Sequence, residues 1–382
     1  MSAFVIVGAG MAGGKAAETL REEGFDGGVV LIGAEPERPY ERPPLSKDYL
    51  RGESERAGVY LQDDPSWYEQ HEVQLRTSAS VESLDVGERA VLLEGGERID
   101  YDALLLAPGA EPKRLAVPGA DLEGVHVLRT LDDALALRAV LRPGVRLAVV
   151  GAGLVGLEVA ATARALGAAV TVVEAAPAPL AAVLGERIGS WLAQLHRAAG
   201  VEVLTGVTLD AVHGGEAVSA LRLGEGRRIA CDAVLMAVGM APATGWLDGC
   251  GLAAGAVVAD HAGRTRLPRV YAAGDARGAG HWETAARQGA TVAATILGVS
   301  APAAPPAAFW SDQHGVRLQF AGTAAGHDRV EVEGDPVAGD ACALFHRGGR
   351  LLGGLLVGRP RDLPALRRRL QETTLEHERS AA

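Results

Sequence analysis

Two glycine-rich segments carry the clearest chemical signal in this chain of 382 residues. Each has the pattern Gly-x-Gly-x-x-Gly between a short apolar segment and a helical one: Gly8, Gly10 and Gly13 in the first, and Gly151, Gly153 and Gly156 in the second. In such a loop the first glycine permits a tight turn, the second lets a pyrophosphate approach the backbone, and the third lets helix and strand pack closely. The helix N-terminus offers free N–H groups to the phosphates. Each segment therefore predicts a dinucleotide site.

A carboxylate completes each pattern at the end of the next apolar segment. Glu35 follows the first fingerprint and Glu174 the second, and each can accept hydrogen bonds from ribose hydroxyls. Glu174 would repel a 2′-phosphate, and the segment Ala175–Leu180 contains no Arg or Lys to hold one. The pattern predicts two bound dinucleotides, FAD at the first site and NADH rather than NADPH at the second.

A proline-rich stretch, Arg38 to Leu50, follows the first fingerprint. Its three prolines exclude a helix interior or a central strand, so we expect a stiff backbone segment. Arg42 and Lys47 lie on it, and a stiff cationic surface beside a dinucleotide suits a flavin whose reduced form is an anion. A plain surface turn with chance charges is the alternative interpretation.

A third carboxylate, Asp275, follows the apolar segment Val270–Ala273 in a Gly-Asp pair. Asp275 can bind a sugar-alcohol hydroxyl next to a pyrophosphate, and Gly274 gives the backbone the freedom to turn there. We expect both residues at the FAD site.

These elements predict an α/β protein with two Rossmann-like dinucleotide-binding domains plus a small α+β C-terminal domain. We expect a β-meander over Val81–Ile99 and a linker over Ala301–Ala308. The buried segment Ala233–Gly239 is expected to return the chain to the first domain. The predicted domains are residues 1–110 with 232–300 for FAD, 111–231 for NADH, and 301–382 at the C-terminus.

The composition excludes several other classes. A formal net charge of −11 argues against nucleic acid as a partner. The cysteines Cys231, Cys250 and Cys342 form no Cys-x-x-Cys pair, which fits a reducing cytoplasm. An apolar segment that begins at Ala3 leaves no room for a signal peptide, and no run of about 20 apolar residues predicts a membrane span. The histidines show no metal-ligand spacing, so no metal is expected.

Three motifs give the chain a resemblance to a known family: Arg42–Lys47, Tyr271–Asp275 and Phe309–Gln313. With the two fingerprints, the chain resembles the FAD-dependent NADH:ferredoxin reductases of bacterial oxygenase and cytochrome P450 systems. These belong to the wider pyridine nucleotide–disulfide reductase superfamily. The resemblance runs from Phe4 to about Arg369.

The resemblance implies roles for further residues. Lys47 would lie by the N5 edge of the flavin and pair with Glu158, which makes these two the catalytic candidates. The backbone of Val81 would meet the adenine of FAD, Arg129 would also bind FAD, and Trp310 would lie near the isoalloxazine.

The chain departs from the family pattern at three segments, namely Ala107–Gly109, Gly239–Ala243 and His281–Thr284. The first lacks a threonine that the family usually has. The contacts of the third with FAD or with an interface stay open.

The implied reaction passes a hydride from NADH to FAD and then single electrons to a ferredoxin-type iron–sulfur protein. Superfamily members that reduce disulfides or peroxides need a redox cysteine, and Pro43 to Ser46 stand where it would be expected. A slow NADH-binding flavoprotein that senses redox state remains an alternative, as do rubredoxin, quinone or oxygen as acceptors. The protein is expected to be a monomer or a homodimer.

A basic cluster near the C-terminus is a candidate docking surface for an acidic ferredoxin. It comprises Arg359, Arg361, Arg367, Arg368 and Arg369. A solvated face of a last helix is the alternative interpretation.

Overall fold

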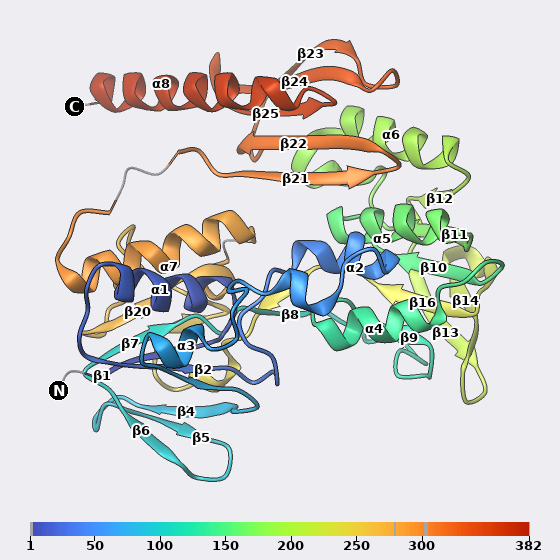
Figure 1. Ribbon diagram of the computed structural model, residues 1–382. Coiled ribbons are helices and arrows are strands. Elements are labelled where there is room, and N and C mark those ends of the chain that lie inside the picture. The colour runs from blue at the N-terminus through green and yellow to red at the C-terminus, as the bar shows by residue number, and fades with distance from the viewer. Residues whose placement is uncertain (1–2, 279, 302–304, 382) are drawn as a thin grey trace. The chain divides into compact units, whose positions relative to one another are not determined.

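The computed structural model describes residues 3–278, 280–301 and 305–381 (Figure 1). They divide into two compact units, each built from three chain segments. Unit 1 comprises Met1–Pro43, Glu55–Glu111 and Met240–Ala304, and unit 2 comprises Pro44–Ser54, Pro112–Gly239 and Pro305–Ala382. The α/β architecture is the one expected from the sequence.

A five-stranded parallel sheet forms the centre of unit 1. Its order is β20 (Val270–Ala272), β7 (Ala103–Leu106), β1 (Ala3–Val7), β2 (Gly28–Ile32) and β3 (Val73–Arg76). Apart from the edge strand β3, which also carries Gln74 and Arg76, the strands are short apolar runs, as expected for a sheet covered on both faces. The loop after β1 is therefore placed at the carboxyl edge of the sheet, where nucleotide sites form.

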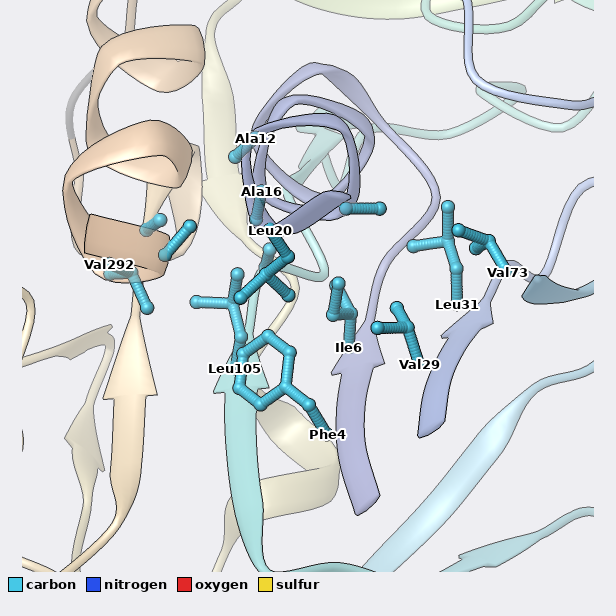
Figure 2. Close-up of a cluster of buried hydrophobic side chains, with 14 of the residues drawn as sticks. Phe4, Ile6, Ala12, Ala16, Leu20, Val29, Leu31, Val73, Leu105 and Val292 are labelled. Carbon is cyan, nitrogen blue, oxygen red and sulfur yellow. The ribbon is translucent and has the colours of Figure 1, made fainter. Parts of the chain in front are cut away.

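Two helices, α1 (Met11–Glu22) and α7 (Trp282–Leu297), pack against each other in this unit. Side chains of α1, such as Ala16 and Leu20, lie over Ile6 and Leu105 of the strands beneath, and Val292 of α7 joins the same cluster (Figure 2). Apart from Leu20, the buried residues of α1 are alanines and glycines, which brings the helix close to the sheet.

A three-stranded antiparallel meander covers part of unit 1: β4 (Val81–Asp85), β5 (Ala90–Leu93) and β6 (Arg98–Asp100). This confirms the meander expected over Val81–Ile99. Its buried side chains, among them Val91 and Leu93, share a hydrophobic cluster with Leu104 and Leu106 of β7.

Unit 2 contains a second parallel sheet of five strands. Its order is β12 (Glu202–Thr205), β11 (Ala169–Glu174), β10 (Arg146–Val150), β16 (Ala233–Met236) and β9 (Val125–His126). The helices of this part are α4 (Leu131–Val140), α5 (Leu154–Ala165) and α6 (Ala181–Ala198), and an antiparallel sheet is formed by β13 (Leu209–Gly214), β14 (Val218–Leu223) and β15 (Arg228–Ala230).

The expectation that Ala233–Gly239 returns the chain to the first domain is wrong for its strand. β16 pairs with β10 from Leu147↔Ala233 to Val150↔Met236, so it belongs to the second sheet. An apolar run suits either parallel sheet, and only the non-local pairing decides between them. The three-domain boundaries otherwise stay a prediction.

The C-terminal segment of unit 2 forms an antiparallel sheet of five strands with one helix, α8 (Leu363–Ala381). The strand order is β21 (Ala308–Gln313), β22 (Val316–Gly322), β25 (Arg350–Val357), β24 (Asp340–Arg347) and β23 (Arg329–Asp335). The sequence indicated β22, β24, β25 and a final helix. Strands β21 and β23 were not predicted: polar residues interrupt β21, whereas β23 has the alternation of valine with charged residues that is typical of a half-exposed strand.

The proline-rich stretch forms no long element. It contains a 3₁₀ turn over Pro43–Ser46 and the short helix α2 (Asp48–Arg51). Other short elements are α3 (Trp67–Gln70), β8 (Ala110–Pro112), β17 (Met240–Pro242), β18 (Ala253–Ala254), β19 (Ala256–Val257), and the 3₁₀ turns η2 (Arg56–Val59), η3 (Gly224–Gly226), η4 (Gly245–Leu247), η5 (Gly274–Arg277) and η6 (Pro360–Asp362). Of the linker expected over Ala301–Ala308, residues 302–304 lie outside the described residues. Among the described helices, none is long and apolar enough to cross a membrane.

Gly289 sets the closeness of α7 to α1, and its substitution tests that packing. A Cβ atom at Gly289 would lie 2.0 Å from the main-chain oxygen of Ala12. We expect Gly289→Ala to lower the free energy of unfolding by about 1–3 kcal/mol, because the two helices must separate. Thermal denaturation measures the change. Gly245→Ala is the control, since its Cβ would meet no described atom within 4 Å, and equal melting temperatures for the two variants would contradict the packing argument.

Candidate functional site

The first glycine loop has the geometry of a phosphate cradle. Gly8 has a φ of 111°, and a Cβ there would lie 1.9 Å from the main-chain oxygen of Ala107. A Cβ at Gly13 would lie 2.0 Å from the oxygen of Gly8, so these two glycines are required by the fold itself. At Gly10, which is the N-cap of α1, a Cβ would meet no described atom within 4 Å. The fold therefore leaves open the one glycine that a pyrophosphate would approach.

Glu35 lies beyond β2 in a small polar cluster of unit 1. Its Oε1 accepts from Arg42 Nη2 at 2.6 Å, and its Oε2 accepts from the Tyr40 hydroxyl at 2.5 Å. The Arg42 guanidinium also lies 4.9 Å from the centre of the Tyr40 ring. The structure thus brings two predicted site residues, Glu35 and Arg42, into direct contact.

Arg42 stays fully charged in this cluster. Burial lowers the pKa of its guanidinium, but the neighbouring Tyr40, Glu35 and Asp275 raise the pKa by more than burial lowers it. Asp275 therefore lies close enough to Arg42 for the two charges to interact. An anion beside Arg42 would gain from this charge in a partly buried setting.

The Gly274–Asp275 pair lies against the start of α1. A Cβ at Gly274, whose φ is 74°, would lie 3.2 Å from the Cβ of Ala12, and the Gly274 N–H donates to Gln288 Oε1 at 2.8 Å. Asp275 therefore lies beside the first glycine loop, and its binding of FAD stays a prediction. Val81 opens β4, opposite Leu93, and its side chain packs against the meander's cluster.

The second glycine loop, in unit 2, repeats the first almost position by position. Gly151 has a φ of 101° and a Cβ there would lie 2.4 Å from the oxygen of Ala237, while a Cβ at Gly156 would lie 2.2 Å from the oxygen of Gly151. Gly153, the N-cap of α5, again leaves its Cβ position open. The same division of roles in both loops fits two dinucleotide sites.

Glu174 ends β11 and faces the second loop. Its Oε2 accepts from the N–H of Ala152 at 2.6 Å, and its Oε1 accepts from the N–H of Ala176 at 2.8 Å. The carboxylate is held by two backbone groups beside the turn, where a ribose would lie. The binding of NADH by Glu174 stays a prediction.

Lys47 and Glu158 form a buried ion pair within unit 2. Lys47 Nζ lies 2.6 Å from Glu158 Oε2, and the two residues are 8% and 5% exposed. Lys47 comes from the turn after Ser46, and Glu158 comes from the second turn of α5. The pairing implied by the resemblance is present.

The carboxylate of Glu158 has two further donors that the sequence did not reveal. Ser46 Oγ donates to its Oε2 at 2.5 Å, and Ser311 Oγ donates to its Oε1 at 2.6 Å. Gln313 Nε2 donates to Ser311 Oγ at 2.9 Å, and Gln313 Oε1 lies 3.0 Å from His196 Nε2. Nothing in the sequence marks these residues as partners of Glu158, apart from the position of Ser311 and Gln313 inside the Phe309–Gln313 motif.

A histidine pair ends this network. His196 Nδ1 and His314 Nε2 lie 3.0 Å apart. His196 is fully buried on α6, whereas His314 is half-buried in the turn between β21 and β22. Burial, followed by the charges of His196 and Arg164, lowers the pKa of His314 to about 4, and burial also lowers the pKa of His196.

Two other predicted site residues lie in unit 2. The main-chain N–H of Arg129 donates to Asp133 Oδ2 at 2.9 Å, just before the capping box of α4. Trp310 lies on β21 opposite Gln319 of β22, and because side chains alternate along a strand it projects to the face opposite Ser311.

The basic cluster near the C-terminus is smaller than the sequence suggested. Arg359 is already neutralised, because its Nη1 lies 3.2 Å from Glu333 and its Nε lies 2.5 Å from Asp340. Arg361, Arg368 and Arg369 are exposed, and Arg367 is half-buried.

The remaining sequence observations have structural explanations. His281 is the N-cap of α7 and Glu283 lies in its first turn, where a carboxylate is favoured by the helix dipole. Cys231 is buried, and Cys250 and Cys342 are half-buried. Within the described residues, no cluster of His, Cys, Asp or Glu has the arrangement of a metal site.

Two family models match the chain. Residues 2–289 match pyridine nucleotide-disulphide oxidoreductase, and residues 308–382 match a reductase C-terminal domain. The chain belongs to the pyridine nucleotide-disulphide oxidoreductase family. Pyridine nucleotide-disulphide oxidoreductases and ferredoxin–NAD(P)⁺ reductases use FAD and NAD(P)H.

Relatives of known activity match this family member over nearly their whole length. The ferredoxin reductase component of chlorobenzene dioxygenase from Cupriavidus sp. (strain PS12) is 39% identical, over 96% of this chain and 92% of the relative. The ferredoxin–NAD(+) reductase component of the biphenyl dioxygenase system from Paraburkholderia xenovorans (strain LB400) is 37% identical, over 92% and 87%.

Solved structures agree with these relatives. Putidaredoxin reductase, in a covalent complex with putidaredoxin, matches with a TM-score of 0.94 at 30% identity, covering 97% of this chain and 93% of that one. A ferredoxin reductase from Rhodopseudomonas palustris matches with a TM-score of 0.90 at 33% identity, covering 95% and 93%. The predicted fold and family are confirmed.

The histidine pair makes stability depend on pH. The pKa of His314 in the folded protein lies below the ordinary value of about 6.5, so the unfolded chain takes up a proton at a higher pH than the folded protein does. The free energy of unfolding therefore falls as the pH drops from 6.5 toward 4. We expect His314→Gln to lose less free energy of unfolding than the parent protein between pH 6.5 and 4. Urea denaturation at several pH values measures this. The exposed His261→Gln is the control, and a parallel decline in parent and His314→Gln would show that His314 does not titrate in this range.

Proposed function

We propose that this protein is a flavoprotein reductase that takes electrons from NADH through FAD to a ferredoxin-type iron–sulfur protein, which serves an oxygenase or a cytochrome P450. The observation that carries the proposal is the repetition of one loop geometry at two sites, each with its own carboxylate. The names of the relatives, which are reductase components of dioxygenase systems, support the acceptor.

The residues of unit 1 fit the pyrophosphate half of FAD. The open Cβ position of Gly10 at the start of α1 would admit the diphosphate, and Arg42 supplies a nearby positive charge. Glu35 and Asp275 would accept hydrogen bonds from sugar hydroxyls. We assign Val81, Arg129 and Trp310 to FAD on the resemblance described above. FAD, when bound, couples a two-electron donor to a one-electron acceptor.

Lys47 supplies the positive charge that reduction of a flavin requires nearby. Its ammonium is held by Glu158 at a buried position, where a charge acts over a lower dielectric than at the surface. Because Pro43, Pro44, Leu45 and Ser46 precede it without a cysteine, we propose that this site works by electrostatics rather than by sulfur chemistry.

The second loop would hold NADH. Gly153 opens the start of α5 to a diphosphate, and Glu174 is placed to accept from the adenosine ribose. A carboxylate at this point disfavours the 2′-phosphate of NADPH.

The exposed cations Arg361, Arg368 and Arg369 are the part of the C-terminal cluster that we propose for docking an acidic partner. Three free cysteines fit the reducing cytoplasm that we propose as its location.

Reduction of a panel of ferredoxins tests the proposed function. We expect the FAD-containing protein to reduce cytochrome c with NADH at a rate that depends on added ferredoxin, because the flavin passes electrons singly. Bound flavin is identified by release and chromatography, and omission of ferredoxin is the control. Very slow turnover with every ferredoxin, together with an NADH-dependent change in oligomeric state, would instead indicate a redox-sensing protein. Faster turnover with rubredoxin, quinone or oxygen would indicate another acceptor.

Glu174 predicts the nucleotide preference. We expect a higher kcat/KM for NADH than for NADPH, and a loss of about 10- to 100-fold in the kcat/KM for NADH in Glu174→Ala, since hydrogen bonds to a charged group contribute about 1.5–3 kcal/mol. The value for NADPH should not fall in parallel, because a repulsion is removed as well. Glu202→Ala, at an exposed position on β12, is the control. Equal losses for both nucleotides would mean that Glu174 only supports the loop.

A further inference from the structure

Three fully buried polar side chains form a chain of hydrogen bonds that ends at Glu158. Ser311, Gln313 and His196 are each 0% exposed. Burial of polar groups is unfavourable unless their hydrogen bonds are satisfied, and an apolar residue would fit an ordinary core position better. A row of three such residues, ending on a carboxylate, therefore needs an explanation beyond packing.

The direction of the hydrogen bonds in this row is determined by the carboxylate. A carboxylate only accepts, so Ser311 must donate its one proton to Glu158 Oε1. Ser311 Oγ is then free to accept, and Gln313 Nε2 donates to it at 2.9 Å. Gln313 therefore presents its oxygen to His196, whose Nε2 must donate. Each donor points toward Glu158.

The two oxygens of Glu158 are divided between different parts of the chain. Oε2 accepts from Lys47 and Ser46 on the proline-rich stretch, and Oε1 accepts from Ser311 on β21. Two-sided anchoring prevents the carboxylate from rotating about its last side-chain bond. Without Ser311, Oε1 would be a buried charged acceptor with one donor fewer, and Oε2 would no longer have a defined position for the lysine.

We propose that Ser311 is a positioning residue for the proposed reaction: it fixes Glu158, and through Glu158 it fixes the ammonium of Lys47. The proposal rests on the proposed function, because it assigns Ser311 to the lysine that this function uses. Gln313 and His196 hold the serine hydroxyl in its donating orientation. The C-terminal sheet thereby sets the place of a charge that belongs to the proline-rich stretch.

Ser311 is a cleaner test than Ser46. Ser46 is the neighbour of Lys47 in the chain, and its main-chain oxygen accepts from Thr162 Oγ1 at 2.8 Å, so a change there disturbs the backbone that carries the lysine. Ser311 contacts Glu158 through its side-chain hydroxyl, from a position 153 residues away in the chain.

The first experiment measures the midpoint potential of the bound flavin and, by stopped flow, the rate at which NADH reduces it. We expect Ser311→Ala to shift the potential to a more negative value and to slow the reduction about tenfold, because a hydrogen bond to a charged group is lost. Ser311→Thr keeps the hydroxyl and should restore most of both values. Ser219→Ala, on β14, is the control, since its exposed hydroxyl donates to the main-chain oxygen of His213 on the neighbouring strand β13. If Ser311→Ala does not retain FAD, Ser311→Cys replaces it, because a thiol is a weaker donor of similar shape and should give a smaller shift in the same direction.

A double-mutant cycle with Lys47→Ala shows through which residue Ser311 acts. We expect Ser311→Ala to have no further effect on the potential in a Lys47→Ala background, because coupled residues are not additive. Two outcomes would overturn the inference but not the proposed function. One is that the shifts of the two substitutions add. The other is that Ser311→Ala keeps the parent's midpoint potential while Lys47→Ala changes it. An unchanged potential in Lys47→Ala would overturn the role of Lys47 in the proposed function, and the inference with it.

Discussion

A buried ion pair, Lys47 with Glu158, is the interaction on which much of unit 2 depends. Taking two charges out of water costs several kcal/mol each, and the attraction between them offsets this only with good geometry and further hydrogen bonds. Those bonds come from Ser46 on one side and Ser311 on the other. The proline-rich stretch, helix α5 and the C-terminal sheet therefore meet at one carboxylate, and a change in any of them would leave a charge without its partners.

The glycine loops solve a different physical problem, which is to bring backbone N–H groups to an anion. In each loop the first and third glycines are fixed by contacts with main-chain oxygens, whereas the middle one faces open space. Unit 1 adds a cation, Arg42, held by Glu35. In unit 2, by contrast, the carboxylate of Glu174 binds the loop's own backbone. The two sites share a loop but differ in charge.

Local features of the site were predictable because they are properties of short segments. The loop glycines, Glu35 and Asp275 follow from spacing, since a tight turn after a strand has few solutions. Strand β16 was assigned to the wrong sheet because an apolar run fits either one. Strand β23 was not predicted, although Val330 and Val332 alternate with charged residues as in a half-exposed strand. Arg359 was counted in the basic cluster, but Glu333 and Asp340 neutralise it.

Read alone, the amino-acid sequence settles that the chain has two dinucleotide loops, each with a following acid, and that the position before Lys47 is a serine rather than a cysteine. These facts depend on neighbouring residues and on the backbone conformations that they allow. Only the tertiary structure decides which groups surround Glu158. Ser46 and Ser311 reach it from positions 112 and 153 residues away, and no periodicity or spacing in the chain marks such contacts. The sequence alone shows that position 47 carries a positive charge, but the tertiary structure determines where that charge lies.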